Sequence, residues 1–386
     1  MRTTGDSMND ERFATRYYEY QQELFTHTHI PSDTLDITAN KLHRELRTTP
    51  HTTPFLRQMH VYFQPDVAKH RHKMITLRSK NDLSTMADTA KKHIRAANEA
   101  AKALDYASYK AMMFELDNLD EKRIKYGLVQ LIGYQGKQRK KLKTKHQINA
   151  DNFYNTLATI GPKPRRNNPE KIFSKVHRMF EYDSFANFIE IETDSTLRTP
   201  SALQISSSKV LIKTPAIHSM WNLKCFIDEL SKAIILYYQE DNPVKHFLRP
   251  THIEAFASML SQTLIQKVCT LTEKRYIRQL QVLENSWHSV HALFEFDLHE
   301  KLKSAEEVYK SIVTPIFPMQ SPQIWAFNTY TRGELITKHY KPIGHIMHDN
   351  VTTIARKDRV MPWKLAPWIK ENILRRLDEI GIETLI

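Results

Sequence analysis

The sequence predicts a mainly α-helical fold: a multi-helix, bundle-like body with a small β hairpin or sheet inserted around residues 188–213. Glycine is scarce, with 8 in 386 residues, and glycine supplies the positive φ that tight turns need. Apolar residues recur at three- and four-residue steps over most of the chain, which is the period of an amphipathic helix. The clearest alternation of apolar and polar residues, typical of a strand, falls in one short region.

Composition divides the chain into four regions. Hydrophobic residues make up 41% and charged residues 26% of the chain, as in globular proteins. The regions are an N-terminal arm at 1–40, an N-terminal helical region at 41–136, a basic segment or hinge at 137–166, and a C-terminal helical region at 167–386 that carries the β insertion at 188–213.

The N-terminal arm is rich in aromatic residues that one amphipathic helix would place together. Aromatic side chains this dense near a terminus usually dock on a surface. That surface is either the body of the same chain or a neighbouring subunit, and the sequence leaves both open. In the second case the oligomerisation contacts are Phe13, Tyr17, Tyr18 and Phe25.

Histidines gather between residues 41 and 82, and this raises the question of a metal site. Imidazole is a common zinc ligand, but His70 and His72 have no partner cysteines at zinc spacing. Lys69, Arg71 and Lys73 would also repel a cation. We expect a basic surface patch here and no metal.

A long helix is predicted from Ser84 or Thr85 to about Leu131. Small apolar residues form a seam at helical spacing from Ala87 to Phe114, so a partner helix can approach closely. After the basic segment, Asn168-Pro169-Glu170 is a strong start for the next helix.

The rest of the chain continues as helices around the β insertion. Phe188–Glu192 alternates and Val210–Ile212 is a short apolar run, so both are predicted strands. The predicted helices begin at Pro215, which opens an apolar core helix, and continue over 251–293 and 298–313, with a last one from Pro367 that Gly381 would cap.

No catalytic motif is present. The sequence has no Gly-x-Ser-x-Gly elbow, His-Glu-x-x-His, Cys-x-x-Cys or P-loop. His288 and His291, and His345 and His348, have helical spacing, but no third ligand is suggested, so they are interpreted as structural or surface pairs. The expectation is therefore a protein that is not an enzyme, with no catalytic residue, metal or cofactor.

The basic segment carries most of the net charge, with a net +8 of the chain's +13. Nine cations against one acid, Asp151, suit phosphate contacts without sequence preference. A solvated loop or a nuclear-localisation-like address is the alternative interpretation. The candidate nucleic-acid-binding residues are Lys137, Arg139, Lys140, Lys141, Lys143, Lys145, Lys163, Arg165 and Arg166.

In its whole-chain profile the sequence resembles the α-helical coat proteins of small double-stranded RNA viruses, the partitivirus type. That resemblance implies a self-assembling capsid or nucleocapsid protein that encloses a genome, RNA rather than DNA. It also implies partners that are nucleic acid and the chain itself, with 188–213 as a protrusion and 137–166 as an RNA-facing surface. No segment is long and apolar enough for a membrane span and no secretory signal is present, so we expect an intracellular protein in the virion or the host cytoplasm.

Three other interpretations stay open. The first is a cellular RNA- or DNA-binding factor, such as a ribosome-associated or replication protein. The second is a scaffold in which the lysines only solubilise. An enzyme of an unfamiliar family comes last.

Overall fold

The structure is a computed structural model, and the part of the chain that it describes begins at residue 80. The histidine-rich segment up to residue 79 and the N-terminal arm, including Phe13, Tyr17, Tyr18 and Phe25, lie outside the described residues. These are 80–139, 148–150, 153–165, 167–195, 197, 199–206, 209–238, 250–319, 322–326, 338–377, 380 and 382–386.

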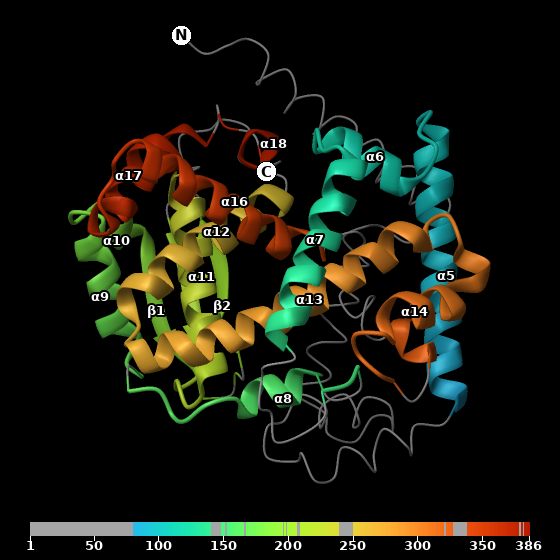
Figure 1. The fold of residues 1–386 in the computed structure, drawn as a ribbon, viewed down its shortest axis with the longest axis horizontal. Coiled ribbons are helices and arrows are strands. Elements are labelled where there is room, and N and C mark those ends of the chain that lie inside the picture. Colours follow the sequence, from blue (N-terminus) through green and yellow to red (C-terminus); the bar gives the residue numbers. More distant parts are fainter. Residues whose placement is uncertain are drawn as a thin grey trace.

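The fold is mainly α-helical with one small sheet, as predicted (Figure 1). The predicted helix over 84–131 is instead three helices: α5 (Lys80–Ala103), α6 (Tyr109–Leu116) and α7 (Glu121–Arg139). Asp105 and Asn118 lie in the breaks with φ of 68° and 52°. Aspartate and asparagine tolerate this left-handed conformation better than most residues, so the chain turns there without a glycine.

Three short helices lead from α7 to the sheet. The predicted start at Asn168 is confirmed, because its side chain accepts a hydrogen bond from the backbone N–H of Lys171 at 2.8 Å and Pro169 is the first helical residue. The three helices are α8 (Phe153–Thr159), α9 (Pro169–Met179) and α10 (Phe185–Phe188).

The sheet has three strands in the order β1-β3-β2. Its strands are β1 (Ile189–Thr193), β2 (Ser201–Ser206) and β3 (Lys209–Thr214). The two predicted strands are β1 and β3, which pair in parallel, while β2 was not predicted and pairs antiparallel with β3.

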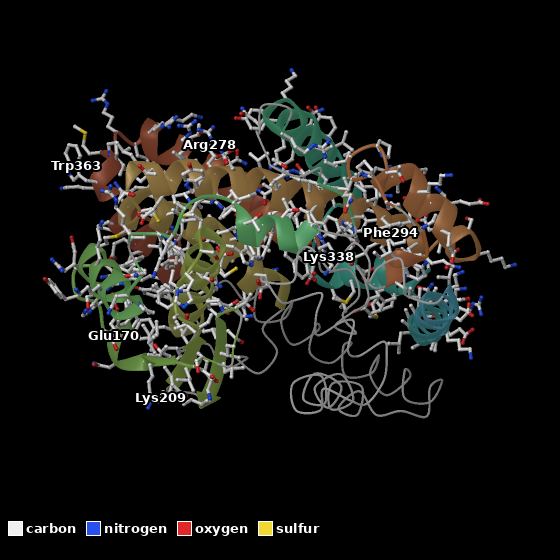
Figure 2. The ribbon with its side chains drawn as sticks, turned by 90° about the horizontal axis from the view of Figure 1, so that it is seen from below. Glu170, Lys209, Arg278, Phe294, Lys338 and Trp363 are labelled. Atoms are coloured by element: carbon white, nitrogen blue, oxygen red, sulfur yellow. The ribbon has the colours of Figure 1, made fainter. Side chains whose placement is uncertain are left out.

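One face of the sheet is buried and the other is exposed. Val210 and Ile212 are fully buried on the face that packs against α11 (Met220–Tyr238). Lys209 pairs with Glu190 at 2.5 Å on the other face and lies at the outer end of the sheet (Figure 2). The sheet therefore covers the helical body with one face.

Four helices form the centre of the molecule: α11, α12 (Pro250–Val268), α13 (Leu271–Leu298) and α16 (Tyr340–Lys357). The predicted helix over 251–293 is two helices, because Thr270 and Glu273 form a capping box that starts α13. Helix α13 runs across the molecule, with α7 and α14 on one part and α11 on the other (Figure 1).

The remaining elements complete the C-terminal part. Helix α16 was not among the predicted helices, and the proposed cap Gly381 lies outside the described residues. No helix in the described part of the chain is long and apolar enough to cross a membrane. The elements are η3 (Leu302–Ser304), α14 (Ala305–Val313), η4 (Pro322–Ile324), η5 (Pro362–Lys364), α17 (Leu365–Asn372), η6 (Leu374–Arg376) and α18 (Ile382–Leu385).

Helices α12 and α16 are in close contact at Gly344. A Cβ atom built on Gly344 would lie 2.3 Å from the carbonyl oxygen of Ala255 and 2.6 Å from Cβ of Ser258.

We expect Gly344→Ala to lower the free energy of unfolding by about 1–3 kcal/mol, because the backbone of α12 must move. The matched control is Gly133→Ala on α7, where a Cβ meets nothing within 4 Å among the described residues. It should raise stability by up to about 1 kcal/mol. Urea denaturation measures both, and equal effects would contradict this packing.

Candidate functional site

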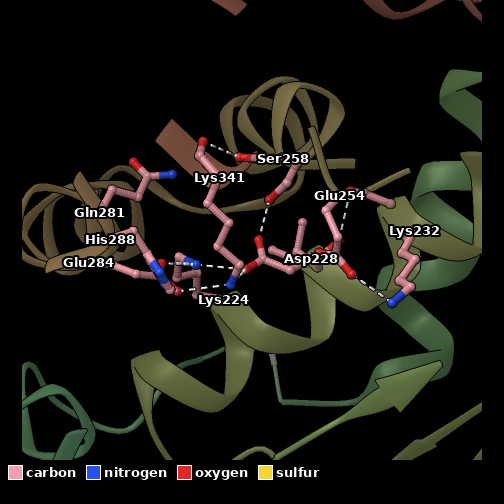
Figure 3. A network of polar contacts seen from close by, with 12 residues as sticks. Lys224, Asp228, Lys232, Glu254, Ser258, Gln281, Glu284, His288 and Lys341 are labelled. Atoms are coloured by element: carbon pink, nitrogen blue, oxygen red, sulfur yellow. Dashed lines mark hydrogen bonds and ion pairs between the residues drawn. The ribbon is translucent and has the colours of Figure 1, made fainter. Parts of the chain in front are cut away.

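The four central helices meet at a group of buried and half-buried charged side chains, which we call the central ion-pair network: Lys224, Asp228, Glu284 and Lys341 (Figure 3). Lys224 Nζ lies 2.6 Å from Asp228 Oδ2 and also pairs with Glu284 Oε2. Lys341 Nζ lies 3.0 Å from Glu284 Oε1 and 3.7 Å from Asp228 Oδ2. Helices α11, α13 and α16 are thus joined by ion pairs.

The local sequence of α11 places two of these charges together. Lys224 and Asp228 are four residues apart, so they lie on one face of the helix. Phe226 and Ile227 between them are fully buried, which keeps the helix inside the protein. The side chains of Lys224 and Glu284 are each only 4% exposed, so water does not solvate their charges and each depends on the other.

The charges around Lys224, Glu284 and Lys341 shift the pKa values of these three groups toward the ionised form. Burial alone would raise the pKa of Glu284, but Lys224 and Lys341 outweigh it and hold that pKa well below its ordinary value. Burial alone would lower the pKa of Lys224, which Asp228 and Glu284 raise instead. Burial alone would also lower the pKa of Lys341, but Glu284 outweighs burial and raises that pKa well above its ordinary value. Two cations and two anions balance at neutral pH.

Neutral polar groups extend the network to α12. Ser261 Oγ donates to Asp228 Oδ1 at 2.5 Å, and Ser258 Oγ donates to the backbone carbonyl of Lys341 at 3.0 Å. Every central helix therefore contributes to one connected polar centre.

Glu229 connects this centre to the sheet. Its Oε2 accepts a hydrogen bond from the backbone N–H of Ala202 on β2 at 2.8 Å. Burial raises the pKa of Glu229. Glu229 therefore joins strand β2 to α11, the helix that carries Lys224 and Asp228.

Of the histidines in the two predicted pairs, His291 is hydrogen-bonded in the core through both ring nitrogens. His291 Nδ1 lies 2.8 Å from the carbonyl of Trp287, and Nε2 lies 2.9 Å from the hydroxyl of Tyr309. Since a carbonyl only accepts, Nδ1 donates and Nε2 accepts. Burial lowers the pKa of His345 to about 4. Within the described ranges no group of three or more His, Cys, Asp or Glu is placed to hold a metal ion.

The basic residues predicted to bind nucleic acid that the structure describes lie at the end of α7 and between α8 and α9. Lys137 is exposed near the end of α7, and Lys163 and Arg165 are exposed between α8 and α9. Arg139 turns inward: it donates to the carbonyl of Ile316 at 2.6 Å and lies 5.3 Å from the ring centre of Phe317. Lys140, Lys141, Lys143, Lys145 and Arg166 lie outside the described residues.

Sequence reasoning missed the central ion-pair network. One signal was available: Lys224 and Asp228 stand four residues apart in a helix that is apolar on nearly every other side. Their partners Glu284 and Lys341 come from distant segments that no local pattern connects to α11.

Solved structures share this fold. No family model and no curated protein sequence matches the chain. PZ peptidase A, solved with an inhibitor, is 10% identical with a TM-score of 0.61, over 98% of this chain and 78% of that one. An M32 carboxypeptidase from Deinococcus radiodurans is 10% identical with a TM-score of 0.55, over 100% and 81%. Metallocarboxypeptidase 1 of Trypanosoma cruzi is 12% identical with a TM-score of 0.52, over 98% and 93%.

These similarities correct the functional interpretation of the sequence. The fold is similar to these solved peptidase structures and not to a partitivirus-like coat protein, so the predicted capsid, virion and viral nucleoprotein function is wrong. The expectation of a non-enzymatic protein with nucleic acid and its own copies as partners, and the alternative of a cellular RNA- or DNA-binding factor, are contradicted as well. The physical reason is that helix content and net charge do not specify a fold. The net charge also counts lysines that are buried and paired with carboxylates, such as Lys224 and Lys110.

One prediction concerns the free energy of unfolding that the central ion-pair network contributes. Lys224→Met leaves Asp228 and Glu284 with one cation between them, so we expect it to lower the free energy of unfolding by about 3 kcal/mol. Lys232→Met is the matched control, because Lys232 pairs with Glu254 where both side chains are about a third exposed, and exposed pairs contribute about 1 kcal/mol or less. Denaturant unfolding measures both variants, and equal losses would contradict a special role for the network.

The second prediction is a loss of stability in mild acid. Burial lowers the pKa of four histidines: to about 4 for His288 and His345, and to about 3 for His291 and His339. The unfolded chain takes up these protons near pH 6.5 and the folded chain does not, so stability is full above about pH 7 and falls as pH drops toward 4. The loss is up to about 1.4 kcal/mol per pH unit for each histidine.

Thermal unfolding between pH 7.5 and 5 measures this loss. His339→Gln should lessen the decrease in Tm, while His218→Gln, at an exposed position, controls for the loss of an imidazole. A Tm that does not change over this range would contradict the burial of neutral histidines.

Proposed function

We propose that this protein is a peptidase-related protein that takes peptides as its ligands. The observation that carries the proposal is the similarity to peptidase structures over 98% of the chain or more. One of those structures, PZ peptidase A, also contains an inhibitor.

Strand β2 offers a place for a peptide beside the polar centre. In the described part of the sheet β2 pairs on one side only, with β3. The backbone N–H of Ala202 points away from β3, since it donates to Glu229. Backbone groups of an antiparallel strand alternate in direction, so Gln204 presents its N–H and C=O to the same outer side. An extended peptide can pair with such an edge at Gln204, next to the Ala202 N–H that Glu229 already occupies.

Apolar side chains next to this edge would contact alternate side chains of the peptide. Leu203 is 48% exposed and Ile205 is 53% exposed, and both stand on the face of the sheet opposite α11. A peptide added to β2 would place every second side chain on that same face. The backbone pairing accounts for affinity, and the Leu203–Ile205 surface favours apolar side chains.

The test is peptide binding to the full chain, measured by fluorescence anisotropy. The probe is a labelled mixture of short peptides in which apolar and polar residues alternate. Leu203→Lys should weaken binding about tenfold, about 1.4 kcal/mol, because a charged side chain replaces the apolar contact. Leu271→Lys is the matched control: Leu271 is 84% exposed at the start of α13, and binding should not change.

Mass spectrometry of the same mixtures after incubation records any cleavage. The proposal fails if no peptide binds and none is cleaved at about 1 mM. The β2 assignment fails if the two lysine variants weaken binding equally.

A further inference from the structure

A metal is the first group to test against the central helices, because one of the similar structures is a metallocarboxypeptidase. Zinc in proteins takes three or four ligands from His, Cys, Asp and Glu. The helical zinc motif His-Glu-x-x-His places two imidazoles four residues apart on one face of a helix. Buried polar residues with that spacing on α11 are Lys224 and Asp228, and a protonated lysine has no lone pair to give.

The carboxylate oxygens of the central ion-pair network are all engaged. At Asp228, Oδ1 accepts from Ser261 at 2.5 Å and Oδ2 lies 2.6 Å from Lys224 Nζ. At Glu284, Oε2 pairs with Lys224 and Oε1 lies 3.0 Å from Lys341 Nζ. A divalent cation would have to displace two ammonium groups and then remain close to both, which repel it strongly in a buried site.

The buried histidines do not complete a metal site with these carboxylates. His288 Nε2 is 3.8 Å from Glu284 Oε1, and both ring nitrogens of His291 are hydrogen-bonded elsewhere. Cys225 stands beside Lys224, but burial raises the pKa of its thiol, and only the thiolate is a good ligand. The residues therefore do not fit a zinc ion.

We propose that the central ion-pair network is a permanent, charge-balanced structural centre that joins α11, α12, α13 and α16 and does not take a divalent metal. Ion pairs here do what a bound metal does in a metal centre, which is to hold side chains from separate helices together. The inference rests on these contacts and not on peptide binding.

The experiment uses the full chain, incubated with zinc and dialysed, with zinc per chain measured by mass spectrometry and Tm measured with and without EDTA. We expect the parent, Glu284→Gln and the control Glu254→Gln to hold the same amount of zinc. Glu254 pairs with Lys232 outside the network. Zinc that all three retain lies elsewhere in the chain and supports the proposal. The proposal would be overturned if the parent and Glu254→Gln each held about one zinc per chain and Glu284→Gln had lost it.

A second measurement needs no variant and covers the case in which Glu284→Gln does not fold. In NMR spectra of the parent with ¹⁵N-labelled lysine, buried and paired ammonium groups give slowly exchanging signals. We expect these signals to keep their shifts and intensities when zinc or EDTA is added. Loss of such signals with zinc, reversed by EDTA, would mean that the metal displaces the lysines, and the proposal would be wrong. Peptide binding enters neither readout, so the two proposals fail independently.

Discussion

The ion pair between Lys224 on α11 and Glu284 on α13 is the interaction on which the arrangement of the central helices depends. Both side chains are 4% exposed, so neither charge can be left alone without a large desolvation cost. Lys341 brings α16 to the same carboxylate at 3.0 Å, and Ser261 brings α12 to Asp228. A shift of α11 relative to α13 would separate Lys224 from Glu284, the two charges that water reaches least.

The central ion-pair network also links the helical body to the sheet. Helix α13 crosses the structure, and its 28 residues pack against α7 and α14 as well as α11 (Figure 1). One residue beyond Asp228, Glu229 binds the backbone of β2. The edge strand proposed to receive a peptide is thus positioned by the helix that carries half of the network.

Local patterns predicted much of this fold and none of its polar centre. Glycine scarcity and helical spacing gave the fold class, and Asn168-Pro169 gave the start of α9, because these signals act within a few residues. The helix breaks at Asp105 and Asn118 were missed, since non-glycine residues with positive φ leave no plain mark. Arg139 was predicted to bind nucleic acid and Lys224 carried no prediction, although both are held inside by partners far away in sequence. The functional interpretation failed for the same reason.

A double-mutant cycle on Lys224 and Glu284 tests the central claim most directly. The free energies of unfolding of Lys224→Met, Glu284→Gln and the double variant are compared with that of the parent by urea denaturation. If the two side chains form the interaction that holds α11 to α13, the double variant loses less than the sum of the single losses, by about 1–3 kcal/mol. Losses that add within about 0.5 kcal/mol would show that the pair is not coupled and would contradict the account.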